Sequence, residues 1–494
     1  MDFPTILQHF PSELSVLLPE LFLATGILLA MVSEFLVGGM RLRTVWFAGF
    51  VAFCSLLLSC IDPGISQHLG TPFEPDRLTL FVRVYASLGA LLATVSIAGS
   101  SRWKGRPEAG EAAIMILSVA LGAMLFASAT NLLTVLLSLE FLSLCSYGLA
   151  GFRGHDARAS EAGLKYVLYG GVASAIALFG ISHIFGMTGS LELATIGRIL
   201  SSGTMDKALL VPIILFCAAY GYKLSLVPFH FWGPDVYEGC PAISAGFLST
   251  VPKAAGFVGL LHALLALFPS WSNFVVGGKL PMFLALFGVA STLVGAVAAG
   301  MQKDARRILA FSSTSNAGTA LIVLSSWITV EAVAVLEFFL LTYLLANFGA
   351  FLALDRLENE TGSSTLERLS GAWKRRPWTT LALGVCLVSL AGVPPMAGFT
   401  AKWSILREVL RAGSAGGAGW IVLVAPVGIL VSSVSLAWAY LRILRATTVD
   451  DGGTGETVAV QPMSGFVLAA CSLGVLGLGW GWPVIEFLRR IIER

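Results

Sequence analysis

Residues 221–240 read GYKLSLVPFHFWGPDVYEGC and lie between two long apolar runs. The stretch carries Lys223 inside the first run and interrupts that run at Pro228. A lysine at the centre of a membrane-spanning helix costs about 2.5–3.5 kcal/mol on insertion scales. A proline removes a backbone donor, and free carbonyls inside a membrane are tolerated only against protein or a water-filled cavity. The stretch therefore predicts a polar path at a helix break within a membrane protein.

The composition supports a polytopic membrane protein. Of the 494 residues, 56% are hydrophobic and only 12% are charged, whereas about 25% charged residues is typical of soluble domains. The net charge is +2, which gives neither a general basic surface nor the footprint of a nucleic-acid-binding protein. We therefore expect a lipid environment and no nucleic-acid partner.

The apolar runs predict about fourteen transmembrane helices, since one span needs about 20 apolar residues. We expect an all-α fold with spans near residues 14–36, 43–61, 77–99, 111–129, 130–151, 162–186, 207–232, 240–268, 281–301, 305–325, 330–353, 378–409, 418–443 and 463–488. The stretch 355–377 is predicted to be a connection rather than a domain.

Two short motifs suggest an internal repeat. LSLVP at 224–228 and VSLAGVPP at 388–395 each place a Ser-Leu pair just before prolines, five helices apart. Segments separated by an odd number of helices run in opposite directions, which is typical of inverted-topology repeats with broken helices. We predict breaks at Pro228, Pro394 and Pro395, a three-helix segment at 1–110, repeats at 111–268 and 281–443, and a C-terminal helix at 463–494.

Short loops rich in lysine and arginine predict the orientation. Basic residues such as Arg102, Arg306 and Lys374 follow odd-numbered helices, and such loops stay on the cytoplasmic side. The first residues show no basic segment or small-residue cleavage site of a signal peptide. We expect a multi-pass protein of the inner (plasma) membrane with both termini on the outer, periplasmic side.

Four charged residues lie inside the predicted spans: Glu140, Lys223, Lys253 and Lys402. We expect Glu140 and Lys223 to pair across helices, because neither has a partner on its own helix. Desolvation disfavours the charged form of a lysine, so that a buried lysine can take and release a proton. A series of such groups predicts a proton relay. The alternative is that the pairs only hold helices together.

Three further residues are possible members of the relay. His230 follows Pro228, and an imidazole titrates near working pH. Glu161 and Lys165 are four residues apart, a spacing that suits a helical ion pair. The alternative for these three residues is a purely structural role. We expect His262 to pack structurally, and Glu337 is an intramembrane acid for which the sequence names no partner.

Redox chemistry is not expected on this chain. The seven cysteines occur singly in apolar runs, without the spacing of a metal or cluster site. No glycine-rich nucleotide motif is present. Any cofactor chemistry is therefore expected on other chains.

Long motifs of this chain resemble a known family. YKLSLVPFHFWGPDVYEGCPA, STVPKAAGF, DARRILAFSSTSNAG and SLAGVPPMAGFTAKW are similar to the antiporter-like, proton-translocating membrane subunits of respiratory complex I. WGPDVYEG and the lysine after VPPMAGF most resemble the branch with bacterial subunit N and mitochondrial subunit 2. The resemblance covers nearly the whole chain.

The resemblance implies a function and roles. Glu140 matches the family's helix-five glutamate, Lys223 its helix-seven lysine, Lys253 its helix-eight lysine and Lys402 its helix-twelve lysine. The resemblance implies that this chain moves protons, driven by electron transfer from NADH to quinone in other subunits. It implies no cofactor on this chain, and NADH, FMN, iron–sulfur clusters and quinone on partner subunits. Neighbouring subunit M and small membrane subunits are the implied partners. Asn316 stands in a segment where the family often has a histidine.

Two other functions remain open from the sequence. The same core occurs in subunits of multi-subunit sodium/proton antiporters and of membrane-bound hydrogenases. A structural scaffold without transport is the third reading, and the set of four buried charged residues argues against it. The chain is thus expected to be a translocase subunit without a redox centre of its own.

Overall fold

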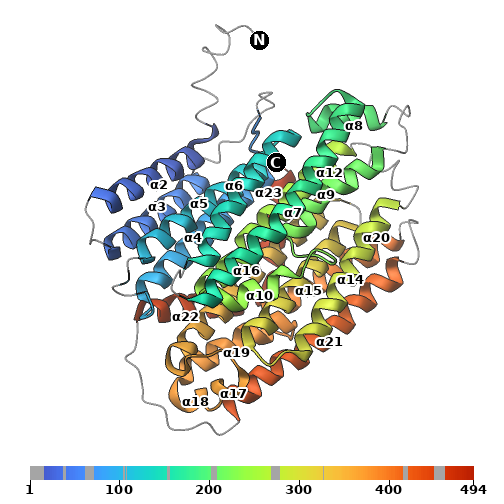
Figure 1. Cartoon of the computed structure of the whole chain (residues 1–494). Helices are drawn as coiled ribbons and strands as arrows, with labels where there is room; N and C mark the ends of the chain where they lie inside the picture. The colour runs from blue at the N-terminus through green and yellow to red at the C-terminus, as the bar shows by residue number, and fades with distance from the viewer. Residues whose placement is uncertain are drawn as a thin grey trace.

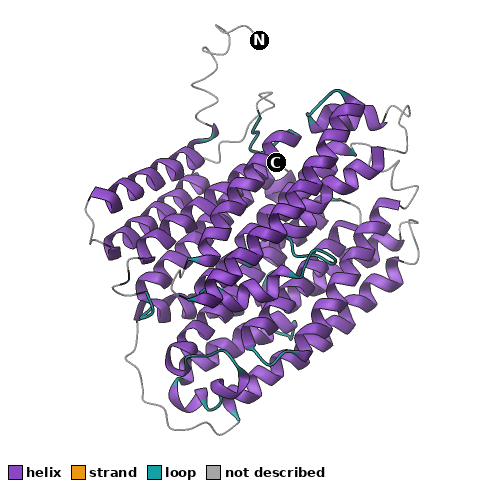
Figure 2. Cartoon of the chain, viewed as in Figure 1, coloured by secondary structure: helices purple, strands orange, loops and turns teal. Residues whose placement is uncertain are grey.

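The computed structural model describes residues 16–36, 41–61, 72–103, 106, 108–152, 156–201, 209–268, 279–325, 328–414, 421–449 and 462–493. Figures 1 and 2 show an all-helical molecule whose long helices run side by side. Twelve described helical segments are long and apolar enough to cross a membrane, and Val211–Lys223 and Pro377–Ala391 are shorter apolar helices. The all-α polytopic prediction is confirmed. The ends of the chain at 1–15 and 494 lie outside the described residues.

The described helices follow one another along the chain and pack into one bundle. In chain order they are α2 (Leu18–Leu36), α3 (Arg41–Ile61), α4 (Arg77–Gly99), α5 (Glu108–Ser128), α6 (Leu132–Gly151), α7 (Ala157–Thr188), α8 (Leu193–Ser201), α9 (Leu210–Lys223), α10 (Trp232–Gly239), α11 (Ala242–Leu248), α12 (Val251–Leu267), α14 (Lys279–Met301), α15 (Ala305–Ser325), α16 (Val330–Thr361), α17 (Leu366–Leu369), α18 (Ala372–Arg375), α19 (Pro377–Ala391), α20 (Ala397–Ser414), α21 (Ile421–Thr448), α22 (Pro462–Gly477), η2 (Leu478–Trp480) and α23 (Trp482–Glu493).

Four of the predicted spans are divided. The span predicted at 463–488, and with it the single C-terminal helix predicted at 463–494, consists of α22, η2 and α23, with a break at Gly481. The span predicted at 207–232 stops at Lys223 and gives way to a loop that contains Pro228. The span predicted at 240–268 is α11 and α12, and Pro252 lies in the first turn of α12. The span predicted at 378–409 is α19 and α20, separated by the loop that holds Pro394 and Pro395. A proline ends a helix because it lacks an N–H and clashes with the preceding turn.

The predicted end of the span at 330–353 was wrong. Helix α16 continues to Thr361 and ends at Gly362, whose φ of 71° is favourable for glycine. The last turns of α16 carry Asp355 and Glu358, which are buried in spite of their charge. Arginines from neighbouring segments bind these two acids, and hydropathy alone does not detect such stabilisation. The predicted connection at 355–377 is therefore shorter.

One helix gives the dimension and polarity of the bundle. Helix α4 has 23 residues, which corresponds to about 34 Å, close to the thickness of a bilayer core. Its first residue follows Asp76, and Arg102, just beyond its other end, binds Glu358 at 3.0 Å. Asp76 and Arg102 therefore mark opposite surfaces of the membrane-spanning bundle.

Candidate proton path

Lys223 is the last residue of α9 and is buried at the point where the helix breaks. Its Nζ donates a hydrogen bond of 3.2 Å to the hydroxyl of Ser143 on α6. Glu140, one turn earlier on α6, accepts a hydrogen bond from Ser174 of α7. The predicted ion pair between Glu140 and Lys223 is not formed directly among the described residues; a serine binds each group. Glu140 remains close enough to interact electrostatically with Lys223.

Lys253 is held entirely by serine oxygens. Its Nζ donates to Ser225 Oγ at 2.5 Å, to Ser313 Oγ at 2.6 Å and to the carbonyl oxygen of Ser313 at 3.3 Å. No carboxylate lies within ion-pair distance of Lys253 in the part of the chain that the structure describes. A buried ammonium bound only by neutral oxygens has no fixed counter-ion, so that its charge is not locked by a neighbouring acid.

Ser225 has an unusual backbone. Its φ is 53°, a left-handed conformation that costs a non-glycine residue free energy and often marks functional sites. The residue lies in the loop that follows α9, one residue beyond the helix cap. The helix break thus directs the Ser225 hydroxyl at Lys253.

Lys402 binds the other broken helix. Its Nζ donates to the carbonyl oxygens of Leu390 at 2.8 Å and Ala391 at 3.3 Å, which end α19, and lies 3.5 Å from Ser433 Oγ on α21. The last carbonyls of a helix lack intrahelical partners and carry partial negative charge. The break before Pro394 therefore supplies the acceptors that keep this ammonium buried.

A small cavity lies beside the Lys402 side chain. Asn316, Tyr343, Ser389 and Lys402 are among its lining residues, and Tyr343 of α16 lies close to Ser313. The polar groups that bind the three lysines come from α6, the loop after α9, α15, the end of α19 and α21.

His230 lies beside this series but is less firmly bound. The side chain is buried in the loop between α9 and α10 and packs against the ring of Phe231. Its Nδ1 has no hydrogen-bond partner among the described residues. Buried polar atoms are rarely left without a partner, so this nitrogen is open to a water or a proton donor, and its part in the relay stays a prediction.

Glu161 and Lys165 form the predicted helical pair, but away from the buried lysines. Lys165 Nζ lies 2.8 Å from Glu161 and also 2.8 Å from Asp235 of α10. Arg307 binds Asp235 at 2.9 Å. Burial alone would raise the pKa of Asp235, but hydrogen bonds and charges from Lys165 and Arg307 lower it. These groups belong to a charged surface network.

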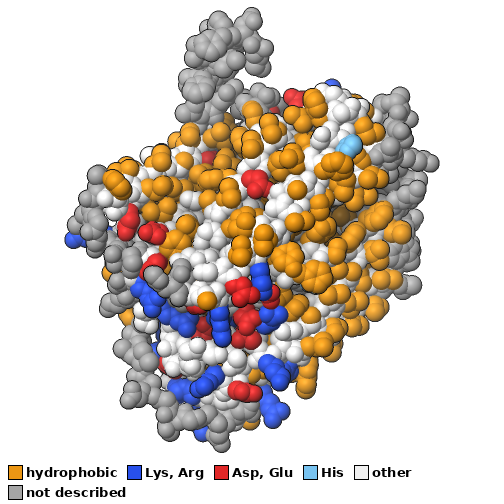
Figure 3. All heavy atoms as spheres, in the orientation of Figure 1, with side chains coloured by type: hydrophobic (Ala, Val, Ile, Leu, Met, Phe, Trp, Pro, Cys, Tyr) orange, Lys and Arg blue, Asp and Glu red, His pale blue; other side chains and the backbone are white. Residues whose placement is uncertain are grey.

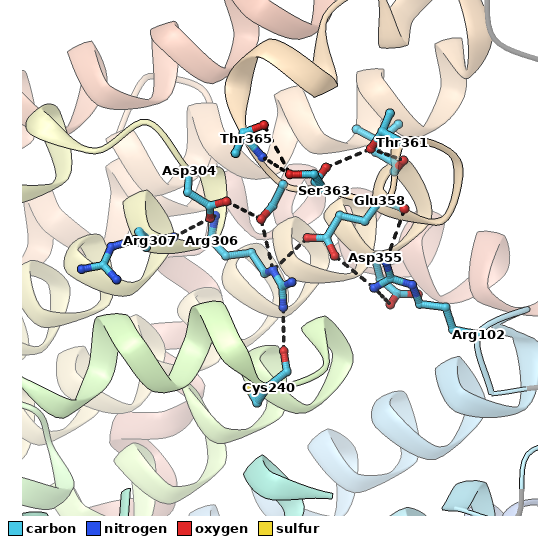
Figure 4. A network of polar contacts seen from close by, with 12 residues as sticks. Arg102, Cys240, Asp304, Arg306, Arg307, Asp355, Glu358, Thr361, Ser363 and Thr365 are labelled. Carbon is cyan, nitrogen blue, oxygen red and sulfur yellow. Dashed lines mark hydrogen bonds and ion pairs between the residues drawn. The ribbon is translucent and has the colours of Figure 1, made fainter. Parts of the chain in front are cut away.

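Most of the remaining charge gathers at one end of the molecule. Figure 3 shows lysine, arginine and acidic side chains together at the end where α17 and α18 lie, below a broad hydrophobic band. Figure 4 shows the buried part, in which Arg306 binds Glu358 at 2.9 Å and the carbonyl of Cys240 at 2.6 Å. Arg102 binds the same glutamate. We call Arg102, Arg306, Asp355 and Glu358 the charged cluster.

The sequence did not identify the serines that bind the buried charges: Ser143, Ser174, Ser225 and Ser313. Serine is common in apolar helices, where its hydroxyl often returns to its own backbone. Only the position of Ser225, between Lys223 and Pro228, gave a signal. No group of three or more His, Cys, Asp or Glu side chains within the described ranges is arranged to hold a metal ion.

Comparison with known proteins identifies the family to which the chain belongs. Residues 129–432 match the family model described as NADH:quinone oxidoreductase/Mrp antiporter, TM. NADH-quinone oxidoreductase subunit N of Anaeromyxobacter sp. (strain Fw109-5) is 33% identical over 96% of each chain. Subunit N 2 of Sorangium cellulosum (strain So ce56) is 36% identical over 98% of each chain.

Solved structures show the same fold. A chain of respiratory complex I from Thermus thermophilus with bound Aureothin has a TM-score of 0.75 at 31% identity, over 93% of this chain and 96% of that chain. A chain of the Mrp complex from Dietzia sp. DQ12-45-1b has a TM-score of 0.82 at 21% identity, over 97% and 96%, which shows the fold alone. The chain belongs to the NADH-quinone oxidoreductase subunit N family, within the wider NADH:quinone oxidoreductase/Mrp antiporter family.

Proposed function

We propose that the chain is the proton-translocating subunit N of a bacterial NADH-quinone oxidoreductase. The observation that carries this proposal is the series of three buried lysines, each at or beside a helix break and each bound by neutral oxygens. A lysine without a fixed acid can change charge at moderate cost. The negative charge of Glu140 favours the protonated form of Lys223, the first of these lysines.

The proposed relay consists of Glu140, Lys223, Lys253 and Lys402. Protonation of one lysine disfavours charge on the next, since like charges repel strongly where water is scarce. A proton that enters at one site therefore favours release at its neighbour. Hydroxyls of Ser143, Ser225 and Ser313, and the cavity beside Lys402, supply the intervening polar contacts.

The breaks at Pro228 and at Pro394 with Pro395 position the first and last lysines. We assign the stretches 111–268 and 281–443 as two inverted repeats, with 1–110 as an added three-helix segment and 463–494 as the closing segment. The similarity of LSLVP, which forms the loop after α9, and VSLAGVPP, which runs from the end of α19 into the following loop, supports this assignment.

The partners follow from the family. We propose NADH, FMN, iron–sulfur clusters and quinone on other subunits, with subunit M and small membrane subunits as neighbours. The inner (plasma) membrane is the proposed location, with the charged cluster on the cytoplasmic side and both termini outside. A cysteine placed in the loop at 102–106 should then react with an impermeant reagent from the cytoplasmic side only.

Purification of the complex from its native membrane through a tag on this chain tests the assignment. We expect flavin and iron–sulfur subunits to copurify, and NADH-driven proton uptake in reconstituted vesicles to fall at least tenfold in Lys253→Ala. Copurification with antiporter or hydrogenase subunits instead would reassign the chain. Full pumping by the alanine variant would remove the relay.

A further inference from the structure

The membrane surface opposite the charged cluster holds a second set of polar contacts. His262 lies on α12, nine residues after Lys253, which corresponds to about 13 Å along the helix. Its Nε2 lies 2.9 Å from Asp76 Oδ2, and its Nδ1 lies 2.7 Å from the carbonyl oxygen of Ala127 near the end of α5. The sequence predicted only packing for His262.

These two contacts fix the number of protons. A carbonyl oxygen only accepts hydrogen bonds, so Nδ1 must carry a proton. An ionised carboxylate also only accepts, so a hydrogen bond from Nε2 to Asp76 requires a second proton on the ring. If Asp76 is protonated instead, the same extra proton lies on the carboxyl group. In either case the pair holds one proton more than a neutral histidine beside a free carboxylate.

Asp76 is itself held in place. It caps α4, because Oδ1 accepts hydrogen bonds from the backbone N–H of Thr79 at 2.9 Å and from its hydroxyl at 3.0 Å. Burial alone would raise the pKa of Asp76, but His262 and Thr79 lower it to about 2. The carboxylate thus carries the charge, and the extra proton lies on the imidazole.

The pair is also accessible. The Asp76 side chain is 45% exposed and that of His262 is 19% exposed, whereas Lys253 is buried. A proton on His262 therefore lies between the buried relay and the surface where α4 begins. Such a position suits release of a proton to that side.

Other titratable groups on the neighbouring elements have separate contacts. Glu192, which precedes α8, and Arg198 of α8 both bind Thr195. Tyr220 of α9 stacks on Phe126, and Glu337 of α16 is buried and interacts electrostatically with Asp76. Glu337 makes no hydrogen bond or ion pair with a described residue, and its negative form would further favour the proton on the pair.

We propose that His262 and Asp76 form a proton-holding site at the outer rim, which receives protons from the buried relay and releases them outside. In the release step the Nε2–H bond breaks and the proton passes to bulk solvent directly or through the Asp76 carboxylate. The imidazole remains neutral with its proton on Nδ1. This inference rests on the proposed proton translocation.

Asp76→Asn is the decisive variant because it preserves every contact. The amide oxygen can still cap Thr79, asparagine being as good a cap as aspartate. The amide nitrogen can donate to a neutral Nε2, while Nδ1 still donates to Ala127. The fold and all hydrogen bonds are retained, but the extra proton is no longer required.

The experiment measures NADH-driven proton translocation of the intact complex in vesicles as a function of pH. With the charge of Asp76 removed, we expect the alkaline limb of the profile to move to lower pH by about one unit, with normal assembly. Asp156→Asn is the matched control, since Asp156 caps α7 through Arg158 N–H and has no histidine partner among the described residues. Its profile should not move.

Lys253→Ala is measured in parallel so that two failures can be distinguished. An unchanged profile in Asp76→Asn, together with lost pumping in Lys253→Ala, would overturn the outer site and leave the relay intact. Normal pumping in Lys253→Ala would remove the translocation function itself. A shift common to Asp76→Asn and Asp156→Asn would show a general effect of charge removal and would also overturn the proposal.

Discussion

The buried lysines and the charged cluster both hold charged groups away from water, but different kinds of partner stabilise them. In the charged cluster, Glu358 is bound by Arg102 at 3.0 Å and by Arg306 at 2.9 Å. Lys253 is bound by Ser225 and Ser313 and by no carboxylate within the described ranges. In a buried ion pair both groups stay charged, because neutralising one leaves the other as an unpaired buried charge. Neutral oxygens stabilise the ammonium but leave it able to lose its proton.

The largest expected effect comes from breaking the charged cluster. Arg306→Ala removes one of the two arginines that bind Glu358 and leaves this buried acid with Arg102 alone. Breaking a buried ion pair by removing one partner costs about 3–5 kcal/mol. We expect a lower thermal stability and poor incorporation of the subunit into the complex, measured by native gel electrophoresis and thermal unfolding. Arg490→Ala, at an exposed pair with Glu486, serves as the control and should assemble normally. Normal assembly of Arg306→Ala would show that the charged cluster contributes little to stability.

Glu140→Gln tests the electrostatic side of the comparison. The amide can still accept the hydrogen bond from Ser174, but the negative charge near Lys223 disappears. We expect assembly to be normal and proton pumping to fall about tenfold, since each 1.4 kcal/mol of lost interaction is a factor of about ten. Proton uptake per NADH oxidised is the measurement. Loss of the subunit from the membrane would instead favour a role in holding α6 and α7 together.

The sequence predicts the buried lysines better than the partners that bind the buried charges. The spans, the breaks and the lysines followed from hydropathy and proline, because a run of about 20 apolar residues matches the bilayer core and a charge within it is costly. The sequence did not predict that α16 extends to Thr361, since the arginines that stabilise its buried acids come from distant segments. It predicted a direct pair of Glu140 and Lys223, whereas the structure places serines on both groups. Side-chain hydroxyls of common residues leave no pattern in one sequence.

Ser225→Gly has the smallest expected effect and acts on one contact. Glycine adopts a φ of 53° without strain, so the stability of the subunit should remain the same or rise slightly. The hydroxyl that binds Lys253 is lost, but Ser313 still binds the ammonium. We therefore expect only a two- to fivefold fall in pumping, which corresponds to about 0.4–1 kcal/mol. Ser59→Gly, where Ser59 Oγ binds the backbone of its own helix, is a control for loss of a buried hydroxyl. Equal pumping in both variants and the wild type would show that the Ser225 hydroxyl is not needed for proton transfer.

The measurement that tests the account most directly is proton pumping by Lys253→Arg. Arginine keeps the positive charge and roughly the reach of lysine, but it stays protonated at any working pH. Proton translocation and NADH oxidation are measured together in vesicles that contain the intact complex. If Lys253 changes its charge in each cycle, the variant assembles normally and pumps at least tenfold less than the wild type. Near-normal pumping would mean that Lys253 supplies only a fixed positive field, and would contradict the claim that lysines on neutral oxygens carry the proton.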